Sequence, residues 1–367
     1  MAREGLPRPG QGATPSQGQP DSPEPAAAPA AARPPARTGL PTAATSQPAA
    51  SATSAPPPST PAAPPKKTRF PLPEGRVARA AVIGVALVVL AAIVVLIARW
   101  LVSTEPVSDF IATYPGESHL PEGSPVGIPT WLAWQHFFNA FFLVLIVKTG
   151  WQVRTQKRPP ASWTPRWSPG GRKISLTLWL HQSLDLLWVT NGVIFVILLI
   201  VSGHWVRIVP TSWDVFPHAI SAALQYASLN WPTENGWVNY NALQLLAYFA
   251  TVFIAAPLAI VTGVRMSQLW PARAKTLTRL YPIEVARALH LPVMFYFVAF
   301  TVVHVALVLS TGALRNLNHM YGGQDAVNWV GFIIFVVSLL VIVGGWFAAR
   351  PIIVVPIASL FGKVART

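Results

Sequence analysis

Six long apolar runs constrain the fold of this chain more than any other feature of its sequence. They cover approximately residues 80–102, 131–151, 174–205, 240–264, 286–310 and 327–348. A helix needs about 20 apolar residues to cross the ~30 Å hydrocarbon core of a bilayer. Only 11% of the 367 residues are charged, against about 25% in soluble domains. We therefore predict an all-α, polytopic membrane helix bundle with about six transmembrane helices.

The first 75 residues differ in character from the rest of the chain. They are dominated by Pro, Ala, Ser and Thr, and contain too few apolar side chains to form a core. We expect a disordered, Pro/Ala-rich cytoplasmic segment at 1–75 and an extra N-terminal transmembrane helix at 76–103. A four-helix core is expected at 131–312, followed by a C-terminal transmembrane helix and a short basic tail at 326–367.

The charges between the runs alternate in sign along the chain. Lys and Arg precede the first run, whereas the next loop holds four acidic residues and no Lys or Arg, and the loop after that holds six Lys and Arg. Because basic loops stay in the cytoplasm, both termini are predicted to be cytoplasmic. The net charge of +14 is then a property of one membrane face, and we expect contact with membrane lipid and no binding of nucleic acid.

The absence of cysteine narrows the possible chemistry. It excludes disulfides, thiolate zinc sites, cysteine-ligated iron–sulfur clusters and covalently attached c-type haem. Redox or metal chemistry in this chain must therefore use histidine, methionine or carboxylate side chains.

Two histidines in the fifth run, His290 and His304, are 14 residues apart. In a helix this spacing is about 40° short of four full turns, so both rings project from nearly the same face. The rise of ~1.5 Å per residue separates them by about 21 Å along the axis. One helix thus offers two axial ligands, each with room for a macrocycle, at two depths of the membrane.

Other helices supply histidines at the same two depths. Given the predicted orientation, His181 lies about two turns inside its run at the depth of His290, and His136 lies near the outer start of its run at the depth of His304. A lone histidine on a helix is more often a hydrogen-bonded structural residue, but four that match at two depths favour bis-histidine ligation of two haems. His204, at the outer end of the third run, remains an alternative to His136, or an interfacial residue near a quinone or a propionate.

Several further polar residues are secondary candidates. Asp185 shares a helix face with His181 and could carry protons or orient that ring, although a structural hydrogen bond explains it equally well. Arg287 and Arg207 could each hold a haem propionate, or simply be interfacial charges. The remaining histidines lie outside the runs and are expected to be ordinary solvated residues: His119, His218 and His319.

The middle of the chain resembles a family of bacterial membrane cytochromes b, the subunits of formate dehydrogenases, nickel–iron hydrogenases and thiosulfate-reductase-like enzymes. The resemblance covers about residues 131–312 and rests on Trp134-Gln135-His136, which opens a run that ends in Thr149-Gly150, on His181, and on the pair His290 and His304. It implies a four-helix bundle with two haems b, ligated by His136, His181, His290 and His304. The extra helices before and after the bundle depart from the family pattern.

The resemblance also implies a function. The chain would anchor a separate catalytic redox subunit, of molybdopterin or hydrogenase type and reached directly or through an iron–sulfur subunit, in the cytoplasmic membrane of a bacterium. It would exchange electrons with menaquinone or ubiquinone without transforming a substrate alone. The alternatives are a proton or metal transporter that uses histidine and Asp185 without haem, and a purely structural anchor.

Overall fold

The computed structural model describes residues 75–117, 119–167, 173–231, 235–271 and 273–366. The chain divides into two units at residues 70 and 71, and the description below concerns the second unit. All but the last residue of the segment predicted to be disordered, 1–75, lies outside the described residues.

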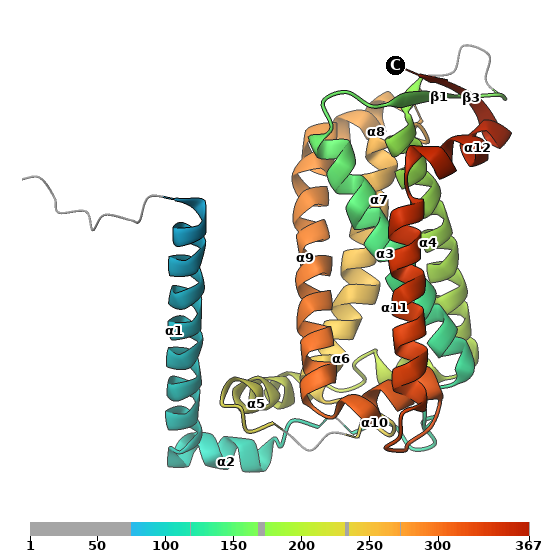
Figure 1. The fold of residues 1–367 in the computed structure, drawn as a ribbon. Coiled ribbons are helices and arrows are strands. Elements are labelled where there is room, and N and C mark those ends of the chain that lie inside the picture. Colours follow the sequence, from blue (N-terminus) through green and yellow to red (C-terminus); the bar gives the residue numbers. More distant parts are fainter. Residues whose placement is uncertain (1–74, 118, 168–172, 232–234, 272, 367) are drawn as a thin grey trace, which may run out of the picture. The chain divides into compact units, whose positions relative to one another are not determined.

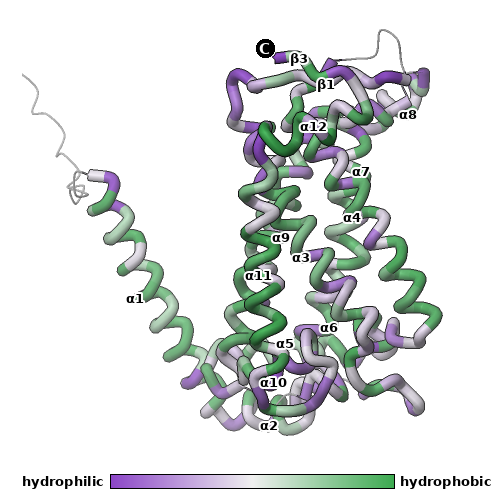
Figure 2. The backbone as a smooth tube through the Cα atoms, turned by 45° about the vertical axis from the view of Figure 1, so that its right-hand side comes forward, coloured by the Kyte–Doolittle hydropathy of each residue, from purple (hydrophilic) through white to green (hydrophobic). Residues whose placement is uncertain are grey.

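Within that described part, six helices are long and apolar enough to cross a membrane. They are α1 (Arg76–Val102), α3 (Thr130–Thr155), α4 (Leu176–Val201), the continuous stretch Ala242–Met266, α9 (Ile283–Ser310) and α11 (Val330–Ala348). Figure 1 shows α3, α4, α7, α9 and α11 side by side as a bundle, and Figure 2 shows that apolar residues dominate along these helices. The predicted all-α, multi-pass membrane bundle is therefore confirmed.

The third predicted run is longer than the helix that it forms. Ser175 caps α4 by accepting a hydrogen bond from the Leu178 N–H over 3.1 Å. The helix ends at Val201 because Gly203 adopts a left-handed backbone conformation with φ 74°, a common way for helices to stop. His204 therefore belongs to a separate short 3-10 turn, η1 (His204–Arg207), and not to the transmembrane helix in which we expected it.

The stretch Ala242–Met266 is interrupted near its middle. It consists of α6 (Ala242–Phe249), a π-helical segment η2 (Ala250–Ala255) and α7 (Ala256–Met266). The π-helical segment comes directly before α7, whose second residue is Pro257. Because proline has no N–H to continue the helical ladder, the wider π-helical turn accommodates the break.

Shorter elements at the two ends of the bundle did not follow from the hydropathy of the sequence. They are α2 (Glu105–Thr113), α5 (Val215–Ala227), α8 (Lys275–Leu280), α10 (Ala313–Leu317), the π-helical turn η3 (Asn318–Gly322) and α12 (Pro351–Phe361). α5 packs Val215 and Ala219 against Ala242 and Leu245 of α6 in a small apolar core.

A small antiparallel sheet covers the end of the bundle that bears α12 (Figure 1). Strand β1 (Ala161–Pro165) pairs with β2 (Ile174–Ser175) and with β3 (Gly362–Arg366). Trp163 is buried beneath it and donates its indole N–H to the Ala358 carbonyl over 3.1 Å. The residues predicted as a short basic tail thus form a strand that ties the chain end to the basic loop between α3 and α4.

The interior of the bundle is held by side chains from all four helices of the expected core. Val293 and Phe297 of α9 pack with Ala255 of η2, with Leu143 of α3 and with Trp188 of α4. The Phe297 ring meets the Trp188 ring edge to face at 6.0 Å. Phe297 lies halfway along α9 between His290 and His304, so this apolar cluster separates two polar levels of the bundle.

Candidate functional site

The four histidines singled out from the sequence form two pairs in the bundle. We name the pairs inner and outer after the orientation predicted from the loop charges. The inner pair consists of His181 on α4 and His290 on α9, with ring centroids 6.5 Å apart and ring planes at 84°. The outer pair consists of His136 on α3 and His304 on α9, with centroids 6.2 Å apart and planes at 55°. The structure therefore brings together the partners that the depth argument matched, and α9 contributes one histidine to each pair.

A threonine on a neighbouring helix orients each ring of the inner pair. Thr149 on α3 places its hydroxyl 3.0 Å from Nδ1 of His181 and 2.8 Å from the carbonyl oxygen of Leu145. A hydroxyl has one proton, which Thr149 donates to that carbonyl, so its oxygen accepts the Nδ1–H of the histidine. This tautomer leaves the lone pair of Nε2 free to bind a metal.

The same arrangement recurs at His290. The hydroxyl of Thr262 on α7 lies 2.7 Å from the Leu258 carbonyl oxygen and 2.8 Å from Nδ1 of His290. It therefore fixes the tautomer of His290 in the same way. Neither threonine was assigned a role from the sequence, although the repeated Thr-Gly dipeptide near the ends of two runs was a visible signal.

The glycine of each Thr-Gly dipeptide lies against the same ring. A Cβ at Gly150 would come within 3.1 Å of Cε1 of His181, and a Cβ at Gly263 within 3.7 Å of Cε1 of His290. Each dipeptide thus presents one hydroxyl and one bare stretch of backbone to one histidine.

The outer pair has aromatic surroundings. Nδ1 of His136 is buried and has no hydrogen-bond partner among the described residues, and the Tyr321 ring lies 5.9 Å from its ring. Phe300 stacks on His304 at 5.7 Å, and Tyr248 meets it edge to face at 6.2 Å. Water-poor walls of this kind suit a large apolar macrocycle better than a hydrated ion.

Both pairs have the spacing that two axial ligands of one metal require. The ring centroids of the two pairs are 6.2 and 6.5 Å apart, so one metal ion could lie between the two imidazoles of each pair. Within the described ranges, no group of three or more His, Cys, Asp or Glu gathers to hold an ion, whereas haem iron takes only two ligands from the protein. The residues present therefore fit haem.

The two secondary candidates near the inner pair differ in their placement. Oδ2 of Asp185 lies 3.6 Å from Nε2 of His181, which is too long for a hydrogen bond. The carboxylate thus neighbours the free nitrogen without holding it. Arg287 is exposed, one turn before His290.

His204 and Arg207 are engaged in local structure at the end of the bundle that bears His136 and His304. Nδ1 of His204 contacts the Ser202 hydroxyl at 3.0 Å, and its ring meets the Trp131 ring edge to face. Among the described residues, the His304 ring contacts the rings of His136, Tyr248 and Phe300, and not that of His204.

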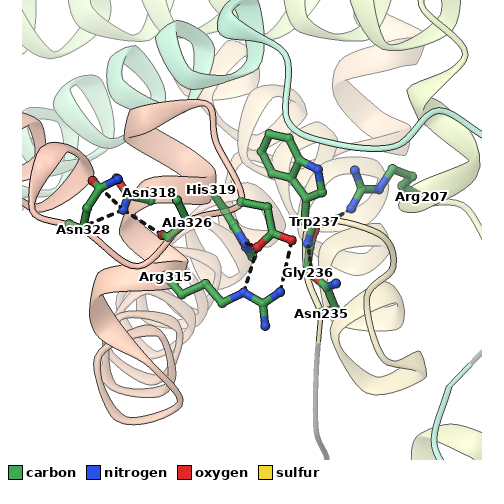
Figure 3. Close-up of polar contacts among 10 residues, drawn as sticks. Arg207, Asn235, Gly236, Trp237, Arg315, Asn318, His319, Ala326 and Asn328 are labelled. Carbon is green, nitrogen blue, oxygen red and sulfur yellow. Dashed lines mark hydrogen bonds and ion pairs between the residues drawn. The ribbon is translucent and has the colours of Figure 1, made fainter.

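The guanidinium of Arg207 is buried and donates to the Gly127 carbonyl over 2.5 Å. It also donates to the Gly236 carbonyl over 2.6 Å (Figure 3). It also lies over the Tyr240 ring. Arg207 therefore joins two loops, and its role at a haem propionate stays a prediction.

Two histidines expected to be solvated are buried instead. His218 accepts a hydrogen bond at Nδ1 from the Gly116 N–H over 3.2 Å, and burial lowers its pKa. His319 lies in η3 with Nε2 2.8 Å from Asp325, which also binds Arg315 (Figure 3). Hydrogen bonds from Arg315 and His319 lower the pKa of Asp325 to about 2. His119 is exposed, as expected.

Comparison with known proteins gives one relative of this chain. No protein-family model matches, and no solved structure matches significantly. A protein of Azospira oryzae that is provisionally named protein-methionine-sulfoxide reductase subunit YedZ1 is 28% identical over 193 residues, which are 49% of this chain and 88% of the relative. The chain is thus similar, over about half of its length, to a protein named as a subunit of an oxidoreductase.

Proposed function

We propose that this chain is the membrane subunit of an oxidoreductase and carries electrons through two haems b between the quinone pool and a separate catalytic subunit. The observation that supports this most directly is the pair of bis-histidine arrangements on one shared helix, with centroids 6.5 and 6.2 Å apart. When bound, haem supplies an iron that takes up and releases one electron at a time. His181 and His290 would ligate the inner haem, and His136 and His304 the outer haem.

The remaining residues of the site hold, orient and shield these ligands. The Thr149 and Thr262 hydroxyls fix the tautomer of the inner histidines and increase the basicity of Nε2. Gly150 and Gly263 leave room for the rings. The cluster around Phe297 and Trp188 excludes water from the middle of the bundle, and this low-dielectric environment helps to set the redox potential of a buried group.

The partner would be a catalytic subunit outside the membrane. The name of the Azospira relative places that protein in a protein-methionine-sulfoxide reductase, which supports the general class of a redox-enzyme subunit. For this chain we propose a partner of the molybdopterin or hydrogenase type or of that reductase type, reached directly or through an iron–sulfur subunit. Because the chain has no cysteine, a cysteine-ligated cluster would have to come from the partner.

The proposed orientation follows the charge pattern. Both termini and the end of the bundle near His181 and His290 would face the cytoplasm of a bacterium, because the basic loops lie at that end. The outer pair would then lie toward the opposite face. Menaquinone or ubiquinone would exchange electrons with the subunit from within the bilayer.

Transmembrane electron flow in proteoliposomes tests this function. Ferricyanide is enclosed inside vesicles that hold the purified chain, a reduced quinol is added outside, and ferricyanide reduction is followed by absorbance. We expect flux above that of protein-free vesicles, and a fall to their leak rate for His181→Ala and for His304→Ala. The exposed His119→Ala is the matched control and should keep the wild-type flux. Equal flux in all variants would contradict the proposal.

A further inference from the structure

A cavity of about 580 Å³ opens at the end of the bundle that bears the sheet, and none of the four paired histidines lines it. Its walls come from α3, α4, the end of α11 and the start of α12, which follows α11 at a bend (Figure 1). Most of the wall is apolar and includes Val147, Leu180 and Val354. The function proposed above makes no use of this cavity.

Two cationic side chains line the cavity and no acidic side chain does. Lys148 donates hydrogen bonds to the carbonyls of Trp346 and Ala349, the latter over 3.2 Å, which leaves one N–H of its ammonium group. Arg350 is exposed and lies over the Phe347 ring. Neither cation has an acidic partner among the residues that the structure describes. The like charges of Lys148 and Arg350 at one cavity would be relieved by an anion.

The backbone adds to this positive potential. α12 begins at Pro351, which lines the cavity next to Arg350. The N-terminus of an 11-residue helix carries a partial positive charge. Pro351 has no N–H, and the N–H groups of Ile353 and Val354 bind the Arg350 carbonyl, so this end of α12 acts on an anion through its charge. The polar amides of Gln152 and Gln156 also line the cavity, so an anion there would meet hydrogen-bond donors as well as charge.

The surroundings indicate that the anion belongs to a lipid. Trp151 and Trp346 border the cavity with 49% and 43% of their surface exposed, and exposed tryptophans are typical of the level of lipid headgroups. Apolar side chains of α11 such as Ile333, Leu340 and Val343 are also exposed and would lie beside acyl chains. Basic pockets between transmembrane helices at the cytoplasmic side are known to hold acidic lipid headgroups.

We propose that this cavity binds the phosphate headgroup of an anionic phospholipid, held by Lys148, Arg350 and the start of α12. The bound lipid would bridge α3, α11 and α12, and so stabilise the bend between α11 and α12. None of the four histidines lines this site, and the proposal stands whether or not the chain binds haem.

Native mass spectrometry of the purified full-length chain tests this proposal. The protein in neutral detergent is titrated with phosphatidylglycerol, with phosphatidylcholine of the same acyl chains, and with inorganic phosphate. We expect preferential binding of phosphatidylglycerol, which falls about tenfold in the double variant Lys148→Gln/Arg350→Gln. The matched control Arg154→Gln/Lys157→Gln removes two exposed charges from the same basic end without touching the cavity, and should bind as the wild type does.

The single variant Arg350→Gln shows whether a loss of lipid binding in the double variant reflects a folding defect, because it keeps the bonds from Lys148 to the end of α11. It should weaken phosphatidylglycerol binding while the melting temperature without lipid stays unchanged. Equal binding of the two lipids, or an unchanged affinity in the double variant, would overturn the proposal. If inorganic phosphate binds as tightly as phosphatidylglycerol, the cavity is a site for free phosphate and not for a lipid headgroup.

Discussion

At the scale of single residues, the threonines beside the inner pair link packing to redox chemistry. Thr149 and Thr262 each donate their hydroxyl proton to a carbonyl of their own helix and accept the Nδ1–H of a histidine from a neighbouring helix. A hydrogen bond of this kind makes an imidazole a stronger donor and favours the oxidised metal. The redox potential of the proposed inner haem would therefore depend on both threonines.

Replacing either threonine by valine should raise the midpoint potential of one haem. The change removes the acceptor of the Nδ1–H at nearly constant volume, and a bond of about 0.5–1.5 kcal/mol corresponds to roughly 20–60 mV for one electron. The measurement is a spectroscopic redox titration. Thr190→Val on α4 is the matched control, since the Thr190 hydroxyl binds only the Leu186 carbonyl. A shift in the control as large as in Thr149→Val would refute the account.

The two glycines of the inner site should respond differently to alanine. A Cβ at Gly150 would lie 3.1 Å from the His181 ring, whereas a Cβ at Gly263 would keep an ordinary 3.7 Å contact with His290. We expect Gly150→Ala to displace the His181 ring and reduce haem content, and Gly263→Ala to retain it. Because alanine favours helices over glycine by about 1 kcal/mol, a loss at Gly150 would not reflect a weaker helix. Equal haem content in both variants would contradict this.

At the scale of elements, α11 docks through its first turn. Gly331 is buried against the backbone of Leu317 and Asn318, with no room for a Cβ. The Asn318 side chain is fully buried, accepts from the Gly331 N–H over 2.7 Å and donates to the Ala326 carbonyl over 2.8 Å. The junction between η3 and α11 therefore has one backbone arrangement.

Gly331→Ala should consequently destabilise the protein. Overpacking costs about 1–3 kcal/mol, which lowers the melting temperature by roughly 1–5 °C in a protein of this size. Gly344→Ala on the same helix is the control, because nothing lies within 4 Å of a Cβ there. Thermal unfolding in detergent compares the two, and a Gly331→Ala melting temperature equal to that of Gly344→Ala would show that α11 does not dock in this way.

The elements divide into those that hydropathy predicts and those that depend on distant contacts. The runs at 131–151 and 286–310 closely match α3 and α9 because about 20 apolar residues can hardly adopt another structure in a bilayer. Strand β3, in contrast, pairs with β1 about 200 positions earlier, and no local pattern encodes such a contact. The end of α4 was misjudged because the left-handed Gly203 interrupts an otherwise apolar run.

The candidate site shows the same division. The depths of His136, His181, His290 and His304 follow from their positions in the runs, so the two pairs could be matched from the sequence. The bonds from Thr149 and Thr262 depend on how α3 and α7 are rotated against their neighbours, which the span boundaries do not determine. Histidines buried by short end elements, such as His218 on α5, were mistaken for solvated residues for that reason.

At the scale of the whole molecule, the alternating loop charge predicts the topology, and the cysteine-free sequence makes it easy to test. Single cysteines are introduced as Lys157→Cys in the basic loop and Ser212→Cys in the weakly charged loop, both at exposed positions. A membrane-impermeant maleimide should label Ser212→Cys in cells whose cytoplasmic membrane is intact, and Lys157→Cys only after lysis. The reverse pattern would invert the orientation and the side on which a partner docks.

The haem-to-protein ratio of the purified chain tests the central claim most directly, together with its dithionite-reduced spectrum and the variants His290→Ala and His304→Ala. The account predicts two b haems per chain, and the loss of one haem in each variant. One haem per chain would remove one of the two proposed pairs. No haem in folded protein made with ample haem supply would contradict the account and leave the transporter as the hypothesis to pursue.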